Sequence, residues 1–170
     1  MPVRRLNHAV LYVRDVARSV EFYRDVLGFA PTNAADGLRG AAFLQAPASN
    51  NDHDLALFEI GPQAGASQAG RGTVGLYHLA WEVETLYDLV DVRDRLVARD
   101  ALVGASDHAT TKALYAQDPD GIEFEVCWLL PADRITAEDM AARTSVRRLD
   151  LDAEIARFGA DLRGGLGVSV

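Results

Sequence analysis

Residues 76–86, LYHLAWEVETL, repeat the pattern of residues 6–16, LNHAVLYVRDV, with leucine, histidine and valine at matching positions. Further along each half a second similarity appears, because LFEI at 57–60 resembles EFEV at 123–126. Each half thus carries one histidine near its start and one glutamate near its end. An internal repeat of this kind predicts two copies of one structural module.

The first half has the pattern of a strand, a helix and further strands. Apolar residues of the helical stretch recur at helical spacing, Asp15 stands where an N-cap is expected, and Gly28 stands where a helix ends. We expect these elements over residues 5–13, 16–27, 40–46 and 53–60.

The second half repeats this order after a stretch rich in glycine, alanine and glutamine. We expect its strands and helix over residues 75–83, 85–99, 112–117 and 121–128. The last two strands flank Asp118-Pro119-Asp120-Gly121, where proline presets φ and glycine tolerates a positive φ, so a turn is expected there. The predicted class is α+β, with two βαβββ modules. The predicted bounds are residues 1–62 and 74–131 for the modules, 63–73 for a linker and 132–170 for a helical extension.

The extension belongs to neither copy of the repeat. Thr136 and Asp139 have the spacing of a helix-start box, and residues 149–162 place apolar side chains at helical spacing. We expect one or two helices that cover part of the core or a subunit interface. The tail at 164–170, GGLGVSV, is expected to fray.

Composition excludes several classes of function. With 17 basic and 25 acidic residues, the net charge of −8 disfavours nucleic acid as a partner. A single cysteine, Cys127, excludes an internal disulfide framework and fits a reducing compartment. Because we find no membrane-span pattern and no signal-peptide pattern, we expect a cytoplasmic protein without a membrane partner.

The repeated residues form a candidate metal site. His8 and His78 occupy matching places in the first strand of each half, and Glu59 and Glu125 stand late in the last strand. Taken singly, each would be a core or solvated side chain. As a repeated pair, neutral imidazole and carboxylate are ligands for Fe(II), Zn, Ni or Mn. Glu123 has no acidic counterpart in the first half and is expected to be solvated.

The stretches NHAVLYVRDVARSVEFYRDVLGF and DPDGIEFEV resemble the vicinal-oxygen-chelate superfamily, over about residues 3–130. This group includes glyoxalase I, the bleomycin- and fosfomycin-resistance proteins and the type I extradiol dioxygenases. The resemblance implies paired βαβββ modules that form a half-open barrel around a divalent metal. It also implies a homodimer, with the extension as a candidate interface.

Within that group, residues 108–125 resemble the extradiol signature. The sequence has His108, a five-residue spacer, Leu114-Tyr115, the DPDG turn and then Glu125, with Ser106 as a small departure upstream. The resemblance implies an Fe(II)-dependent dioxygenase that cleaves a catechol-type aromatic with dioxygen. It implies His8, His78 and Glu125 as metal ligands.

The same resemblance assigns roles to three further residues. His108 is the expected proton donor, and Tyr115 is expected to hydrogen-bond the ionised substrate oxygen. The stretch NDHDLALF at 51–58 makes His53 a candidate base or charge stabiliser beside the oxygen site.

Two alternatives remain open at this stage. With Glu59 as a fourth ligand, the site would match a glyoxalase I-like lactoylglutathione lyase that uses nickel or zinc. A metal-free drug-binding resistance protein is the third interpretation, although such proteins typically lack the metal ligands. The His108, Tyr115 and His53 set favours the dioxygenase.

Overall fold

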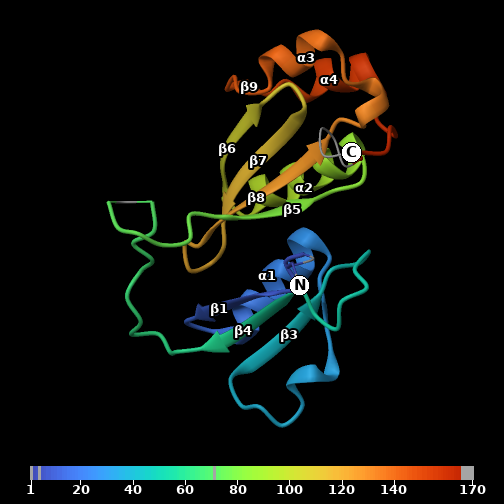
Figure 1. Cartoon of the computed structure of the whole chain (residues 1–170). Helices are drawn as coiled ribbons and strands as arrows, with labels where there is room; N and C mark the ends of the chain where they lie inside the picture. The colour runs from blue at the N-terminus through green and yellow to red at the C-terminus, as the bar shows by residue number, and fades with distance from the viewer. Residues whose placement is uncertain (1, 4, 71, 166–170) are drawn as a thin grey trace. The chain divides into compact units, whose positions relative to one another are not determined.

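The computed structural model describes residues 2–3, 5–70 and 72–165, and the chain forms two compact units. The first unit comprises Met1–Ser67 together with Asp118–Gly121, and the second comprises Gln68–Gln117 and Ile122–Val170. Figure 1 shows that each unit is built around one β-sheet.

The first unit follows the order strand, helix and three strands. Its sheet has the order β1-β4-β3-β2, in which β1 runs parallel to β4 and the other neighbours are antiparallel. A short 3₁₀ turn at Asn33–Ala35 follows β2. The elements are β1 (Ala9–Val13), α1 (Val16–Leu27), β2 (Ala30–Pro31), β3 (Ala41–Gln45) and β4 (Leu55–Glu59).

The second unit repeats this topology with β5-β8-β7-β6 and adds a short strand, β9, beside β6. Again the first strand of the module, β5, is parallel to the last, β8. The elements are β5 (Leu79–Glu82), α2 (Leu86–Ala98), β6 (Leu102–Asp107), β7 (Thr111–Gln117), β8 (Glu123–Leu129) and β9 (Arg147–Arg148). The predicted α+β class with two βαβββ modules is confirmed, and neither sheet closes on itself.

The structure confirms both predicted caps of α1. The Asp15 carboxylate accepts the Arg18 N–H at 2.9 Å, and Gly28 ends the helix with a φ of 74°. This left-handed conformation is the one that glycine adopts without steric cost. The helix buries Phe22, Tyr23 and Val26, and of the apolar residues that the spacing predicts to face the core, Val16, Val20, Tyr23 and Leu27, only Tyr23 is fully buried.

Two kinds of boundary differ from expectation. The first strand begins at Ala9 and not at residue 5, because the Asn7 carbonyl accepts the side-chain amide of Asn51 in place of a strand neighbour. Strands β2 and β6 carry no clear alternation of apolar and polar residues. The residue pattern therefore predicts neither strand, although the module type requires both.

The extension forms two helices, α3 (Ala137–Ala142) and α4 (Leu151–Phe158), on either side of β9. Thr136 and Asp139 form the reciprocal capping box that their spacing predicts. Against α4, the buried indole of Trp128 contacts the Phe158 ring at a centroid distance of 5.8 Å. The tail expected to fray falls mostly at 166–170, outside the described residues. Among the described helices, none is long and apolar enough to cross a membrane.

The DPDG turn packs on α1 as part of the first unit. Asp120 accepts the Arg14 backbone N–H at 2.8 Å and the Arg14 guanidinium at 3.0 Å, and it also pairs with Arg18 at 2.5 Å. The Tyr23 hydroxyl donates to Asp118 at 3.1 Å, and burial, reinforced by the Asp118 carboxylate, holds the pKa of Tyr23 well above its usual range. The Asp120 side chain is only 6% exposed, so this carboxylate is a structural anchor.

We expect Asp120→Asn to lower the free energy of unfolding by about 1–3 kcal/mol, because two arginines lose a charged acceptor. The measurement is urea unfolding, read as a shift in midpoint at constant slope. Asp94→Asn is the matched control, since its ion pair with Arg93 leaves the carboxylate 63% exposed and is expected to contribute little. An equal loss of unfolding free energy in both variants would contradict a structural role for the Asp120 carboxylate.

Candidate active site

One face of the second sheet gathers polar residues. Strand β8 lies between β5 and β7, and its register pairs Glu125 with Ala80 on one side and with Tyr115 on the other. Cross-strand partners point to the same face of a sheet. The alternate residues of β8, Phe124 and Val126, are buried on the face that α2 covers. Glu125 and Tyr115 therefore share the face that turns away from α2, which we call the open face.

His78 joins this pair from the residue before β5. Its Nε2 lies 3.2 Å from Oε2 of Glu125, and its ring centroid lies 6.0 Å from that of Tyr115. Its Nδ1 is buried and has no hydrogen-bond partner among the described residues. The imidazole and the carboxylate thus form a compact donor pair.

His108 stands on the other side of Tyr115, in the loop between β6 and β7. Its Nε2 lies 3.1 Å from the Tyr115 hydroxyl, and its Nδ1 lies 2.9 Å from the Ser145 carbonyl oxygen. Burial raises the pKa of Tyr115, and the Glu125 carboxylate adds to the rise, with a smaller opposing effect from a Ser106 hydrogen bond. The phenol therefore keeps its proton at neutral pH and can donate it.

Two further titratable groups lie on the open face, where Cys127 pairs with Glu82 across β8 and β5. Burial raises the pKa of the Cys127 thiol to about 12, with the Glu125 and Glu82 carboxylates contributing. Burial also raises the pKa of Glu82. Cys127 is consequently a protonated thiol and not a nucleophile at neutral pH.

The first unit brings two other predicted site residues together. The rings of His8 and His53 lie 4.6 Å apart, and His53 stacks on Phe43 at 4.7 Å. His8 Nδ1 lies 2.8 Å from the Asn7 side-chain oxygen, and His53 Nδ1 lies 2.9 Å from Asp52. Since both partner oxygens only accept hydrogen bonds, Nδ1 carries the proton in each ring. In the neutral form, Nε2 of each ring is left with a free lone pair.

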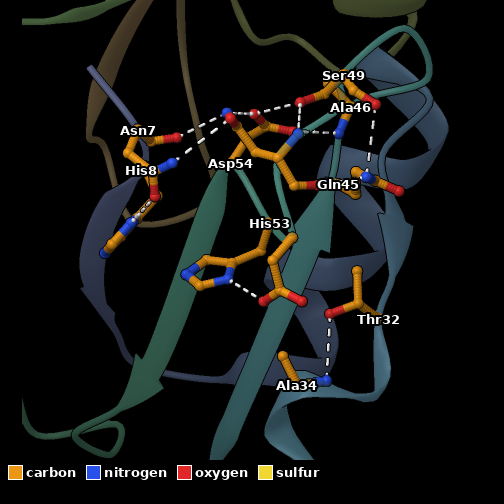
Figure 2. A network of polar contacts seen from close by, with 11 residues as sticks. Asn7, His8, Thr32, Ala34, Gln45, Ala46, Ser49, His53 and Asp54 are labelled. Atoms are coloured by element: carbon orange, nitrogen blue, oxygen red, sulfur yellow. Dashed lines mark hydrogen bonds and ion pairs between the residues drawn. The ribbon is translucent and has the colours of Figure 1, made fainter. Parts of the chain in front are cut away.

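A polar network fixes the segment around these histidines (Figure 2). Asp54 accepts the Ser49 hydroxyl at 2.7 Å and the Ala46 N–H at 2.8 Å, and Asn51 donates to it at 2.6 Å. Asn51 also donates to the Asn7 carbonyl at 2.8 Å. The loop before β4 is thereby tied to the residue that precedes His8.

Glu59 is separated from this group by the strand register. Val10 pairs with Ala56 in the first sheet, whereas the matching residue Ala80 pairs with Glu125 in the second. The structural counterpart of Glu125 is therefore Ala56, and the sequence alignment of LFEI with EFEV is wrong in register. Glu59 pairs with the buried Val13 and accepts the Val16 N–H at 3.1 Å, at the start of α1. Its carboxylate caps a helix on the covered side of the sheet.

No three histidine, cysteine, aspartate or glutamate side chains among the described residues are close enough to hold a metal ion. The predicted ligand set draws on both units, with His8 in the first and His78 and Glu125 in the second. The donor pair of the second unit does fit a metal. A separation of 3.2 Å corresponds to two ligands at about 2.1 Å with an angle of about 100° between them. The three-ligand set stays a prediction.

Sequence reasoning missed the groups that orient these side chains. The Ser145 carbonyl belongs to the extension, which carries no signature, and a backbone oxygen leaves no trace in residue identity. The role of Asn7 can be predicted from the sequence, because Asn7 precedes a predicted ligand and its side-chain oxygen is the kind of acceptor that metal-binding histidines commonly use.

Comparison with known proteins identifies the relatives of this chain. A sequence model of the Glyoxalase/Bleomycin resistance protein/Dioxygenase superfamily matches residues 5–126. The chain is 31% identical to a catechol-2,3-dioxygenase of Bacillus subtilis over 121 residues, which is 71% of this chain and 40% of that protein. It is 30% identical to a probable lactoylglutathione lyase of Synechocystis over 124 residues, covering 71% and 92% of the two chains. The named relatives therefore divide between two reactions.

Solved structures support the fold. A glyoxylase/bleomycin resistance protein/dioxygenase domain from Frankia matches with a TM-score of 0.58 and 22% identity, over 74% of this chain and 92% of that one. The fosfomycin resistance protein FosX from Listeria monocytogenes matches with a TM-score of 0.55 and 14% identity, over 81% and 98%. At such identities the likeness concerns the fold alone.

We expect Glu125→Ala to weaken binding of Fe(II) at least about 100-fold, because even partners that only orient a ligand are worth about 10–100-fold. Glu123→Ala is the matched control, since Glu123 lies on the same strand and face but contacts Gln117. The measurement is metal affinity under anaerobic conditions with a competing chelator. Iron binding by Glu125→Ala at the level of the unaltered protein would remove Glu125 from the ligand set.

Proposed function

The chain belongs to the Glyoxalase/Bleomycin resistance protein/Dioxygenase superfamily, and we propose that it is a metal-dependent dioxygenase that cleaves a catechol-type aromatic ring. The observation that carries the proposal is the hydrogen-bonded pair of His108 and Tyr115 beside the donor pair of His78 and Glu125. A residue pair of this kind can take a proton from a phenolic substrate and return it later in the reaction.

We propose Fe(II) as the metal, with His8, His78 and Glu125 as its ligands. Two imidazoles and one carboxylate leave positions free for further ligands, which suits iron that activates oxygen. When bound, the iron supplies a site where the diol and dioxygen react together. The Nδ1–H of His8, held by Asn7, leaves Nε2 free to be the ligand atom.

Tyr115 and His108 then act as a proton relay. A substrate hydroxyl gives its proton to the Tyr115 oxygen while the Tyr115 proton moves to His108 Nε2, which forms an imidazolium. The raised pKa of Tyr115 keeps the phenol protonated before and after this transfer. His108 returns the proton to an oxygen of the product, and the pair is restored. We assign His53 as an additional base beside the site for dioxygen, because Asp52 holds its Nδ1–H and the neutral ring then has a lone pair on Nε2.

The surroundings of Glu59 favour this reaction over that of a lactoylglutathione lyase with two histidine and two glutamate ligands. The Glu59 carboxylate is engaged by the first N–H of α1, and Glu59 shares a sheet face with Val13 and not with Tyr12. At the place that corresponds to Glu125, the first sheet has Ala56 and no donor. A three-ligand site is therefore the better supported proposal.

We expect the protein reconstituted with Fe(II) without oxygen to consume dioxygen and form a yellow ring-opened product with at least one catechol. Tyr115→Phe and His108→Gln should retain iron but lower kcat by about 10²–10⁴, the usual contribution of a positioned acid or base. Tyr87→Phe, on the exposed side of α2 at 63% exposure, is the control and should retain full activity. No cleavage of any catechol by fully iron-loaded protein would refute the proposal. Turnover of methylglyoxal and glutathione with nickel would establish the lyase instead.

We expect Glu59→Gln to leave the affinity for Fe(II) unchanged and to lower the free energy of unfolding by about 0.3–1 kcal/mol through the helix terminus. Chelator competition and urea unfolding measure the two effects. A loss of metal as large as that of Glu125→Ala would make Glu59 a fourth ligand and favour the lyase.

A further inference from the structure

The proton on Nδ1 of His108 decides whether Nε2 can accept a hydrogen bond. Nδ1 lies 2.9 Å from the Ser145 carbonyl oxygen, and a carbonyl only accepts hydrogen bonds, so Nδ1 carries a proton. In the neutral ring, Nε2 is then a lone pair, and it accepts the Tyr115 hydroxyl at 3.1 Å. With the opposite tautomer, Nε2–H would face the phenol, and Tyr115 would have no acceptor in His108 for its proton.

The carbonyl that sets this tautomer comes from the C-terminal extension. Ser145 lies between α3 and β9, beyond residues 5–126 that the family pattern covers. Its N–H and its hydroxyl both donate to the Ala142 carbonyl, at 2.8 and 2.7 Å. These two bonds fix the backbone turn from which the Ser145 carbonyl reaches His108.

Strand pairing holds this turn next to the His108 loop. In β9, Arg147 pairs with Asp107 and Arg148 pairs with Ser106 in antiparallel register, so the chain just before Arg147 runs beside the loop that follows Asp107. The Arg147 guanidinium also lies 3.0 Å from the Asp107 carboxylate. Both the chain before Ser145 and the chain after it are therefore tied down.

A buried cation joins the same loop to α4. Lys112, whose side chain is 0% exposed, lies 2.5 Å from Asp107 and 3.0 Å from Glu154 of α4. Asp107 in turn accepts the Ala109 N–H at 2.8 Å, next to His108. Burial by itself raises the pKa of Asp107, but Lys112, the Ala109 N–H and Arg147 together bring that pKa below its usual value. A buried ammonium needs such partners, so the extension and the loop stabilise each other.

We propose that the C-terminal extension positions His108, and that the Ser145 carbonyl holds its Nδ1–H tautomer so that Nε2 stays the acceptor for Tyr115. Ser145 is a positioning residue, because it acts through His108. The inference rests on the proposed function only for what His108 does with the proton, since the tautomer itself exists without any substrate or metal.

The test reads the tautomer directly in the full chain. Long-range ¹H–¹⁵N spectra of ¹⁵N-histidine protein at about pH 8, above the usual histidine range, distinguish Nδ1–H from Nε2–H. His108→Gln identifies the His108 signals among the four histidines of the chain. We expect the Nδ1–H pattern for His108.

The decisive variant weakens the acceptor and leaves every side chain in place. Replacing Val146 by its α-hydroxy acid turns the Ser145 carbonyl into that of an ester, which is a weaker acceptor, while the 73% exposed valine side chain stays. The same exchange at Val74, an exposed valine far from the extension in sequence, is the matched control. We expect only the Val146 exchange to shift His108 toward Nε2–H and to lower kcat for a catechol by about 3- to 10-fold, as for one weakened hydrogen bond.

The outcomes separate the two proposals. An Nε2–H pattern in the unaltered protein, or an Nδ1–H pattern that the Val146 exchange does not change, would overturn the positioning role. An Nδ1–H pattern that the exchange shifts supports it even if no catechol is cleaved, and in that case only the proposed function fails.

Discussion

The register of β8 between β5 and β7 is the constraint on which the candidate site depends. It aligns Ala80, Glu125 and Tyr115 in one row across three strands, on the open face. A shift of one residue would send Glu125 under α2 and bring Phe124 or Val126 to the open face. Because those two side chains are almost fully buried, the hydrophobic core fixes the position of the carboxylate. The site is in this sense a consequence of the packing behind it.

Strand β7 serves both faces of the same sheet. Tyr115 points to the open face, while Lys112 and Leu114 belong to the covered side and are buried there. Lys112 pairs with Asp107 and Glu154, so the charge that attaches the extension lies three residues from the phenol of the site. The extension therefore reaches the candidate site through strand β7, by the Lys112–Glu154 ion pair, and through the His108 loop, by the Ser145 carbonyl.

Much of the fold was readable because its signals are local. Asp15 and Gly28 gave the bounds of α1, and Thr136 with Asp139 gave the start of α3, since caps act within one turn of chain. The repeat gave the module topology. The pair of His108 and Tyr115, predicted from spacing, is joined in the structure by a hydrogen bond, because His108 lies in the loop that precedes β7 and Tyr115 lies on that strand.

The sequence pattern wrongly equates Glu59 with Glu125, for a physical reason. LFEI and EFEV are similar as sequences, but only the hydrogen-bonded register decides which residues of the two sheets correspond. Glu59 lies three residues beyond Ala56, the counterpart of Glu125, and residues an odd number apart on a strand lie on opposite faces. The two copies of the module thus keep one backbone and differ in chemistry. The second sheet has a glutamate where the first has Ala56, and the first unit has the ring pair of His8 and His53. The proposed ligand set accordingly takes its one carboxylate from the second sheet, and two histidines with one carboxylate would leave coordination positions of a metal open.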